Sequence, residues 1–171
     1  MTLRIRRAVV QDAPLVLSFI HELADFERAT ADMVPCTEQD IRRDGFGSSP
    51  RFNVIIAEWE GQPAGMALYF YFYSTWQGKP GIYLEDLYVR PKFRGKGIGH
   101  ALLQDLARAV KREKCLGLRW EVLDWNKEAI GFYQGLGAHF REKWKVMQMD
   151  GKAIDRLIET RNTIDSVPTE E

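Results

Sequence analysis

YLEDLYVRPKFRGKGIG, residues 83–99, combines a strand-like run, a proline and three glycines at alternate positions. Glycine has no side chain, so a backbone containing Gly95, Gly97 and Gly99 can approach a phosphate closely. The helix-like segment that follows would add its N-terminus, where unpaired N–H groups favour an anion. The stretch therefore predicts a phosphate-binding loop between a strand and a helix.

Two common phosphate-binding motifs match these glycines less well than a loop that leads into a helix does. A Walker A loop needs Ser or Thr after its Gly-Lys pair to hold magnesium, but Gly97 follows Lys96 here. A dinucleotide-binding fingerprint needs G-x-G-x-x-G in a first strand–helix turn and an acid about 20 residues later. The spacing here is G-x-G-x-G after several strands, and Glu121 matches that acid only loosely. The alternative that the glycines only form a tight turn, with no bound ligand, remains.

The rest of the chain alternates strand-like and helix-like patterns. We expect helices after a cap at Asp12, from the capping box at 37–40 to the glycines at 45 and 47, over 99–114, from Asn126 to 136, and weakly over 153–159. We expect strands at 2–8, 52–59, 64–73, 82–90, 118–123 and 143–150. Antiparallel strands come first and a strand–helix–strand crossover later, which predicts an α/β class with a mixed sheet.

Length, charge and apolar runs argue against several classes of protein. The chain has 171 residues, which predicts one domain at 1–160 and a polar tail at 161–171. Lys plus Arg and Asp plus Glu both number 24, so no polybasic surface for nucleic acid is expected. The longest apolar run, 64–73, is half the roughly 20 residues of a membrane span. No apolar segment of a signal peptide follows the first residues.

The potential metal and redox residues are scattered along the chain. Cys36 and Cys115 are far apart in sequence, which argues against a disulfide framework or a zinc site. His21, His100 and His139 share no metal-ligand spacing. We therefore expect a cytoplasmic protein with reduced thiols, no bound metal and no membrane partner.

Several blocks in order resemble the GCN5-related N-acetyltransferases (GNAT), specifically their diamine acetyltransferase branch. The blocks are ELADFE, DGFG, YSTWQGK, YLEDLYV, RGKGIG and LDWNKEAIGFYQGLGA, and the resemblance runs from about residue 5 to residue 137. YSTWQG and VLDWN look closer to the thialysine-type members than to the spermidine-type ones. The resemblance implies the GNAT fold, a mixed, mostly antiparallel sheet that splays at its central strands and is flanked by helices.

The resemblance also implies acetyl-CoA as cosubstrate. Pantetheine would pair with the backbone of Leu87, Tyr88 and Val89 in the gap between the splayed strands. The pyrophosphate would lie on the loop and helix start, formed by Arg94, Gly95, Lys96, Gly97, Ile98, Gly99 and His100. The start of the next helix would line the far side of the cofactor through Asn126, Lys127, Glu128 and Ala129.

Acetyl transfer to an amine needs a group that removes a proton and a group that stabilises the departing thiolate. By resemblance Glu85 removes the proton and Tyr133 donates one to the thiolate. Glu85 could instead be a salt-bridged strand carboxylate, and periodicity alone would make Tyr133 a core aromatic. On a regular strand Glu85 and Asp86 point to opposite faces, so only a bulge would bring both into one groove.

A small cationic substrate needs further contacts. The resemblance implies substrate-binding roles for Phe26, Glu27, Glu85, Asp86, Arg119, Trp120, Glu121 and Asp124, and for Ser74 and Thr75, whose hydroxyls can receive an α-carboxylate. Glu27 could equally be a solvated acid at a helix end. Glu142 is not assigned, because the chain between 138 and 144 is shorter than the family pattern.

The expected function is acetyl transfer to a primary amine of a lysine-like, thialysine-like or polyamine substrate, by direct attack in a ternary complex. A non-catalytic CoA-binding module and an enzyme acting on protein or peptide amines are the alternatives. The branch forms homodimers, so the resemblance also implies a homodimer.

Overall fold

A five-stranded sheet in the order β1-β2-β3-β4-β5 organises residues 3–119 of the chain. The computed structural model describes residues 2–160, which form two compact units, 2–121 and 122–160. The expected tail at 161–171 lies outside the described residues. The first unit contains β1 (Leu3–Arg7), α1 (Ala13–Phe26), α2 (Glu38–Phe46), β2 (Asn53–Trp59), β3 (Gln62–Ser74), β4 (Lys79–Val89), α3 (Ile98–Arg112) and β5 (Leu118–Arg119).

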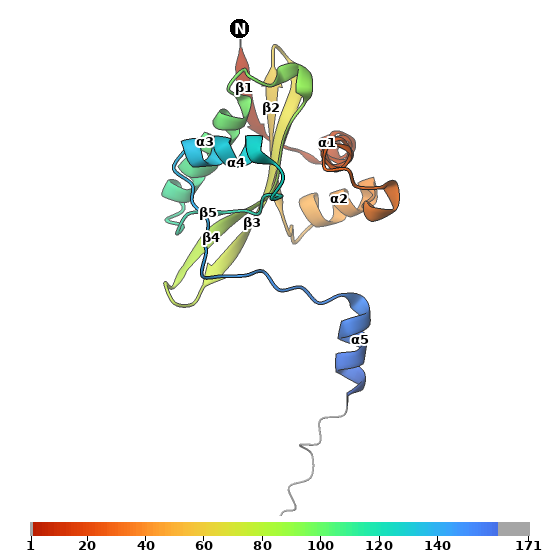
Figure 1. Ribbon diagram of the computed structural model, residues 1–171. Coiled ribbons are helices and arrows are strands. Elements are labelled where there is room, and N and C mark those ends of the chain that lie inside the picture. The colour runs from red at the N-terminus through yellow and green to blue at the C-terminus, as the bar shows by residue number, and fades with distance from the viewer. Residues whose placement is uncertain (1, 161–171) are drawn as a thin grey trace, which may run out of the picture. The chain divides into compact units, whose positions relative to one another are not determined.

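The sheet has the predicted mixed pairing. Neighbouring strands from β1 to β4 are antiparallel, whereas β4 and β5 are parallel and α3 forms the connection between them. Helices α1 and α2 lie on one face of the sheet and α3 lies on the other (Figure 1). The glycine-rich segment is thus the turn from β4 into α3.

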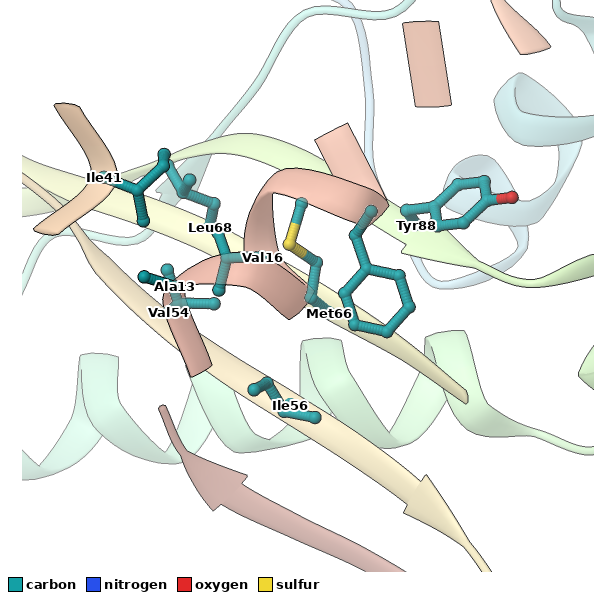
Figure 2. Packing of buried hydrophobic residues seen from close by; sticks show 9 residues of the cluster. Ala13, Val16, Ile41, Val54, Ile56, Met66, Leu68 and Tyr88 are labelled. Carbon is teal, nitrogen blue, oxygen red and sulfur yellow. The ribbon is translucent and has the colours of Figure 1, made fainter. Parts of the chain in front are cut away.

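Two apolar layers hold this unit together. On the α1 face, Val16 and Phe19 pack with Ile56, Met66 and Leu68 of the strands (Figure 2). On the other face, α3 buries the expected apolar stripe, made up of Ile98, Leu102, Leu103, Leu106 and Ala109. A fully buried aliphatic or aromatic side chain contributes roughly 1.5–3 kcal/mol, so these layers fix the position of β4 and of the loop behind it.

The N-terminal cap of α2 is the one that the sequence predicts, whereas that of α1 differs from the prediction. Thr37 accepts a hydrogen bond from the Asp40 amide, the predicted capping box. Asp12 precedes α1 but makes no capping bond. Its carboxylate accepts instead from Arg6, at 2.6 and 2.9 Å, and from the Val9 amide at 2.8 Å. A nearby guanidinium offers a stronger, charge-assisted partner than a helix amide.

The second unit contains α4 (Lys127–Gly135) and α5 (Gly151–Glu159), as predicted. Asn126 accepts from the Ala129 amide at 3.2 Å, and Gly137 takes the left-handed conformation expected after a helix end. The predicted strand at 143–150 is wrong: these residues are exposed and belong to no ladder of the described sheet. Alternating apolar residues favour a strand only where a partner strand supplies hydrogen bonds.

Candidate active site

A β-bulge interrupts β4 in the middle of the sequence YLEDLYV. Leu68 of β3 lies opposite Asp86, but the next β3 residue, Tyr69, lies opposite Leu84. Glu85 is therefore the extra residue, with no counterpart on β3. Bulges re-aim side chains and are common beside active sites. The residue pattern alone does not reveal this irregularity.

The bulge places Glu85 and Asp86 on the same face of the sheet. Leu68 and Phe70, two residues apart on β3, share a face, and they lie opposite Asp86 and Tyr83. Glu85 follows Tyr83 by two residues and so points the same way. Leu68 belongs to the core cluster beneath α1, which identifies this face as the α1 side. The bulge that would bring both acids into one groove is therefore present.

Asp86 is the most perturbed carboxyl group of this face. Burial, and then the negative charges of Glu85 and Glu27, raise its pKa from 3.8 to about 7. Partial desolvation also raises the pKa of Glu27, at the end of α1. The structure thus brings three of the predicted residues into one electrostatic group. Near neutral pH this group can both attract a cation and accept a proton.

The backbone beside these carboxylates has an open edge. Pairing between β4 and β5 is confined to Ile82 with Leu118 and Tyr83 with Arg119. Within residues 2–160, no strand continues along the β5-facing edge of β4 from Leu84 to Val89. The predicted strand at 118–123 is correspondingly shortened to two residues, because its chain leaves the ladder. The sheet therefore splays where the resemblance places pantetheine.

The glycine loop has the conformation and the space that a bound phosphate requires. Gly95 and Gly97 have φ of 72° and 76°, in the left-handed region that other residues rarely adopt. A Cβ added to either glycine would meet no atom within 4 Å. Gly97 is also the N-cap of α3, so the first helical amides lie directly behind the loop. These residues fit a pyrophosphate group.

The two cations of the loop are held by neighbouring side chains. Arg94 donates from Nε to the Val89 carbonyl at 3.0 Å, and its guanidinium lies over the Phe26 ring at 4.8 Å. Lys96 lies over the ring of Trp59 at 5.3 Å. Arg94 thus connects the loop to the end of α1, where Phe26 and Glu27 are located. The sequence did not indicate this connection.

The remaining predicted substrate residues of this unit lie along β3 and β5. Ser74 ends β3 and Thr75 begins the exposed turn after it. Arg119 places its guanidinium 4.2 Å from the ring centre of Phe72, and Trp120 is half-buried. Glu121 accepts a hydrogen bond from the Tyr83 hydroxyl at 2.8 Å.

Tyr83 is a site residue that the motifs of the sequence did not single out. It shares the face of Glu85, and both Glu121 and Glu85 contribute to its raised pKa of about 12, after burial. The sequence contained one signal for Tyr83, because side chains alternate along a strand and Tyr83 lies two residues before Glu85.

The second unit carries the other predicted cofactor and catalytic residues. Asn126 caps α4, and Lys127, Glu128 and Ala129 form its first turn. Tyr133 is half-buried on α4, with its ring 5.3 Å from that of Phe132. Asp124 precedes the helix, and its carbonyl accepts a hydrogen bond from Lys127. Their roles stay predictions.

The bulged carboxylates, the open strand edge and the glycine loop agree with the acyltransferase site that the resemblance implies. The acetyltransferase (GNAT) family model matches residues 18–138. The chain belongs to this family and is an N-acetyltransferase.

Its relatives include thialysine N-epsilon-acetyltransferases. Those of Bos taurus and Sus scrofa are 38% and 39% identical over 164 residues, covering 90% of this chain and 95% of theirs. The human spermidine/spermine N(1)-acetyltransferase-like protein 1 is 37% identical over 79% of this chain, which corresponds to 20% of that protein.

Solved structures agree on the fold. An integron cassette protein of V. cholerae superposes with a TM-score of 0.76 at 25% identity, covering 94% of this chain and 99% of its own. An aminoglycoside acetyltransferase from an uncultured soil sample superposes with a TM-score of 0.71 at 18% identity, covering 86% and 97%. The predicted GNAT fold is confirmed.

Proposed function

We propose that this protein transfers an acetyl group from acetyl-CoA to the primary amine of a small cationic substrate. The observation that carries the proposal is the bulge in β4, which directs Glu85 and Asp86 to one face immediately before the open strand edge and the glycine loop. GNAT acetyltransferases use acetyl-CoA. Acetyl-CoA, when bound, would supply the acetyl group as a thioester, and coenzyme A would leave as the free thiol.

The chain holds the cofactor mainly through its backbone. Peptide groups of Leu87, Tyr88 and Val89 at the open edge can pair with the amide groups of pantetheine. The amides of residues 95–100 and the positive end of the α3 dipole favour the pyrophosphate. Arg94 and Lys96 add positive charge beside it. The residues of the second unit predicted to line the cofactor are Asn126, Lys127, Glu128 and Ala129.

The acidic face performs the first step. A free alkylamine has a pKa near 10.4, so it arrives protonated and must lose a proton before it can attack. Glu27, Glu85 and Asp86 attract the ammonium group, and the Glu85–Asp86 pair then accepts its proton, directly or through a water. Asp86 suits this role because its pKa, about 7, lies close to neutral pH.

Tyr133 performs the complementary step by donating its phenolic proton to the departing thiolate. The transfer is direct, from thioester to amine, without an acyl-cysteine. Burial raises the pKa of both thiols, Cys36 and Cys115, so neither is a ready nucleophile near neutral pH.

The test is release of free thiol from acetyl-CoA in the presence of polyamines, lysine analogues and amino-terminal peptides. We expect release that depends on a small amine, with the acetylated product identified by mass spectrometry. Thiol release with peptides alone would favour a protein-modifying enzyme. Cofactor binding without transfer to any amine would favour a non-catalytic module and contradict the proposal.

The substrate class within this proposal is a lysine-like, thialysine-like or polyamine amine, by analogy with the relatives. The expected homodimer and the cytoplasmic location stay predictions. No described helix is long and apolar enough to cross a membrane. No three metal-ligating side chains within residues 2–160 are placed to hold a metal ion.

A further inference from the structure

We propose that Arg90 is a positioning residue for acetyl-CoA and that it acts through an ion pair with Glu22. The pair ties the end of β4, whose open edge would hold pantetheine, to the last turns of α1. This inference rests on the proposed function and adds to it a residue that acts on the cofactor only through the backbone of β4.

Within residues 2–160, the end of β4 has a strand partner on one side only. Its ladder with β5 ends at Tyr83, and its ladder with β3 ends where Val89 lies opposite Gly65. Pro91 follows soon after and has no N–H to extend the hydrogen bonding. Such strand ends open locally at little cost in free energy. The backbone that would bind pantetheine therefore needs a second support.

The Arg90 side chain supplies this support by joining β4 to α1 and β3. Its guanidinium donates to the Glu22 carboxylate from two nitrogens, with Nη2–Oε1 and Nε–Oε2 distances of 2.7 and 3.0 Å. Nη1 donates to the Pro63 carbonyl of β3 at 3.0 Å. The guanidinium carbon also lies 4.6 Å from the ring centre of Phe19 on α1. A bidentate arginine–carboxylate pair adds geometric specificity as well as energy.

The surroundings of the pair keep it charged and partly shielded from water. The exposed fractions of the Arg90 and Glu22 side chains are 23% and 30%. The hydrogen bond from Arg90 lowers the pKa of Glu22, so this carboxylate is ionised near neutral pH. Ser18, one turn earlier on α1, donates to the same carboxylate at 2.8 Å. Ion pairs that are fixed in this way differ from mobile surface pairs, which contribute little.

Arg90 also sets the direction of the peptide group that precedes it. Its amide donates to the Ala64 carbonyl of β3 at 2.9 Å. In a trans peptide the carbonyl and the amide point in opposite directions, so the Val89 carbonyl faces the open edge. Arg94 donates to this carbonyl at 3.0 Å from outside the ladder. A carbonyl has two lone pairs, so it can accept from a pantetheine amide as well.

Two contacts, each four residues after the other, connect α1 to this part of the chain. Glu22 and Phe26 are one helical turn apart and lie on the same side of α1. Glu22 pairs with Arg90, and the ring centre of Phe26 lies 4.8 Å from the guanidinium carbon of Arg94. Glu27, a member of the acidic group, follows Phe26 directly. The ion pair thus fixes the cofactor-binding edge relative to the helix end that carries Glu27.

Isothermal titration calorimetry of the folded whole protein with acetyl-CoA measures the effect. We expect Arg90→Gln to raise the Kd about 10-fold, because a strand end that adopts the binding arrangement about a tenth of the time binds with about a tenth of the affinity. Glu22→Ala should have a similar effect, and the double variant should bind about as well as either single variant, since the residues act as one pair. At saturating acetyl-CoA, kcat should stay within about 2-fold of wild type, because the bound cofactor restores the arrangement.

Arg6→Gln is the matched control. The Arg6 side chain has an exposed fraction of 24%, close to that of Arg90, and pairs with Asp12 at 2.6 Å and Glu58 at 2.7 Å. This variant should lose comparable stability in denaturant unfolding and keep the wild-type Kd, because β1 and β2 carry none of the cofactor-binding residues. Arg90→Lys, which keeps the charge but loses the planar fork, should raise the Kd by an intermediate factor.

A Kd equal to that of the wild type in Arg90→Gln would overturn this inference while leaving the proposed function intact. If that variant does not fold, an unchanged Kd in Arg90→Lys would overturn it in the same way. An equal rise in Kd in Arg6→Gln would also overturn it, because it would reflect a general loss of stability. The absence of acetyl-CoA binding by the wild-type protein would instead contradict the proposed function itself.

Discussion

Asp86 combines its proposed role as a proton acceptor with a cost in stability. Its carboxyl group binds a proton more tightly in the folded chain, with a pKa of about 7, than at its ordinary value of 3.8. Ionising the group therefore destabilises the folded state, so its contribution to stability falls as the pH rises from about 4 to about 7. Such a cost is common where a site needs a desolvated base.

Asp86→Asn should accordingly stabilise the protein at pH 8 by about 1–3 kcal/mol and leave it nearly unchanged at pH 4. Denaturant unfolding at both pH values measures this difference. The same variant should lower kcat by about 10²-fold and remove the rise in rate through pH 7. Asp105→Asn, on α3, is the matched control. Equal effects of Asp86→Asn on stability at the two pH values would contradict the assignment.

Tyr133 supplies the second residue-level prediction. Tyr133→Phe should lower kcat by about 10²-fold or more, because the thiolate then leaves without a proton donor. The KM for the amine should change little, since the ring is kept. Tyr71→Phe, which removes a hydroxyl that donates to Glu113 on the α3 side, is the control. Steady-state kinetics with near-wild-type turnover in Tyr133→Phe would remove this residue from the mechanism.

Individual residues were easier to predict than their orientation. The motif YLEDLYV identified Glu85 and Asp86, but whether they share a face depends on the bulge, a tertiary feature of the ladder with β3. For the same reason the sequence favoured Glu85 as the base and could not foresee the stronger desolvation of Asp86. The stacking of Arg94 on Phe26 joins residues far apart in the chain and has no local signal.

Among the elements, the turn from β4 into α3 is the best predicted from the sequence. Alternate glycines and the apolar stripe after them indicated its conformation, and the structure places Gly95 and Gly97 in the left-handed region. The prediction of a strand at 143–150 failed because periodicity does not reveal whether a partner strand is present. The prediction that β5 continues to residue 123 failed for a similar reason, because residues 120–123 have a strand-like pattern although the ladder stops at Arg119.

Gly97→Ala tests this element directly. The left-handed conformation should cost about 1–2 kcal/mol of stability for alanine, and the added methyl group should raise the KM for acetyl-CoA several-fold. Gly61→Ala is a close control, because Gly61 has the same φ of 76°, has open space around it and lies in the β2–β3 turn. It should lose similar stability without a change in KM. Equal KM values in the two variants would contradict a role for the loop in cofactor binding.

In the molecule as a whole, fold class and family follow from the order of elements and motifs, because both depend on local patterns. The antiparallel strands, the crossover through α3 and the family membership were all predicted and are confirmed. The assembly is less predictable. Several large apolar side chains of the second unit are exposed, among them Trp144, Met147 and Ile158. A homodimer interface would be one way to cover them, and it stays a prediction.

The central claim is that main-chain amides around Lys96 hold coenzyme A beside the acidic face of the sheet. Isothermal titration calorimetry of the whole protein with acetyl-CoA tests it most directly. The account predicts saturable heat with one site per chain, suppressed when free CoA is present in excess. The absence of heat at saturating acetyl-CoA, together with no competition from CoA, would contradict it.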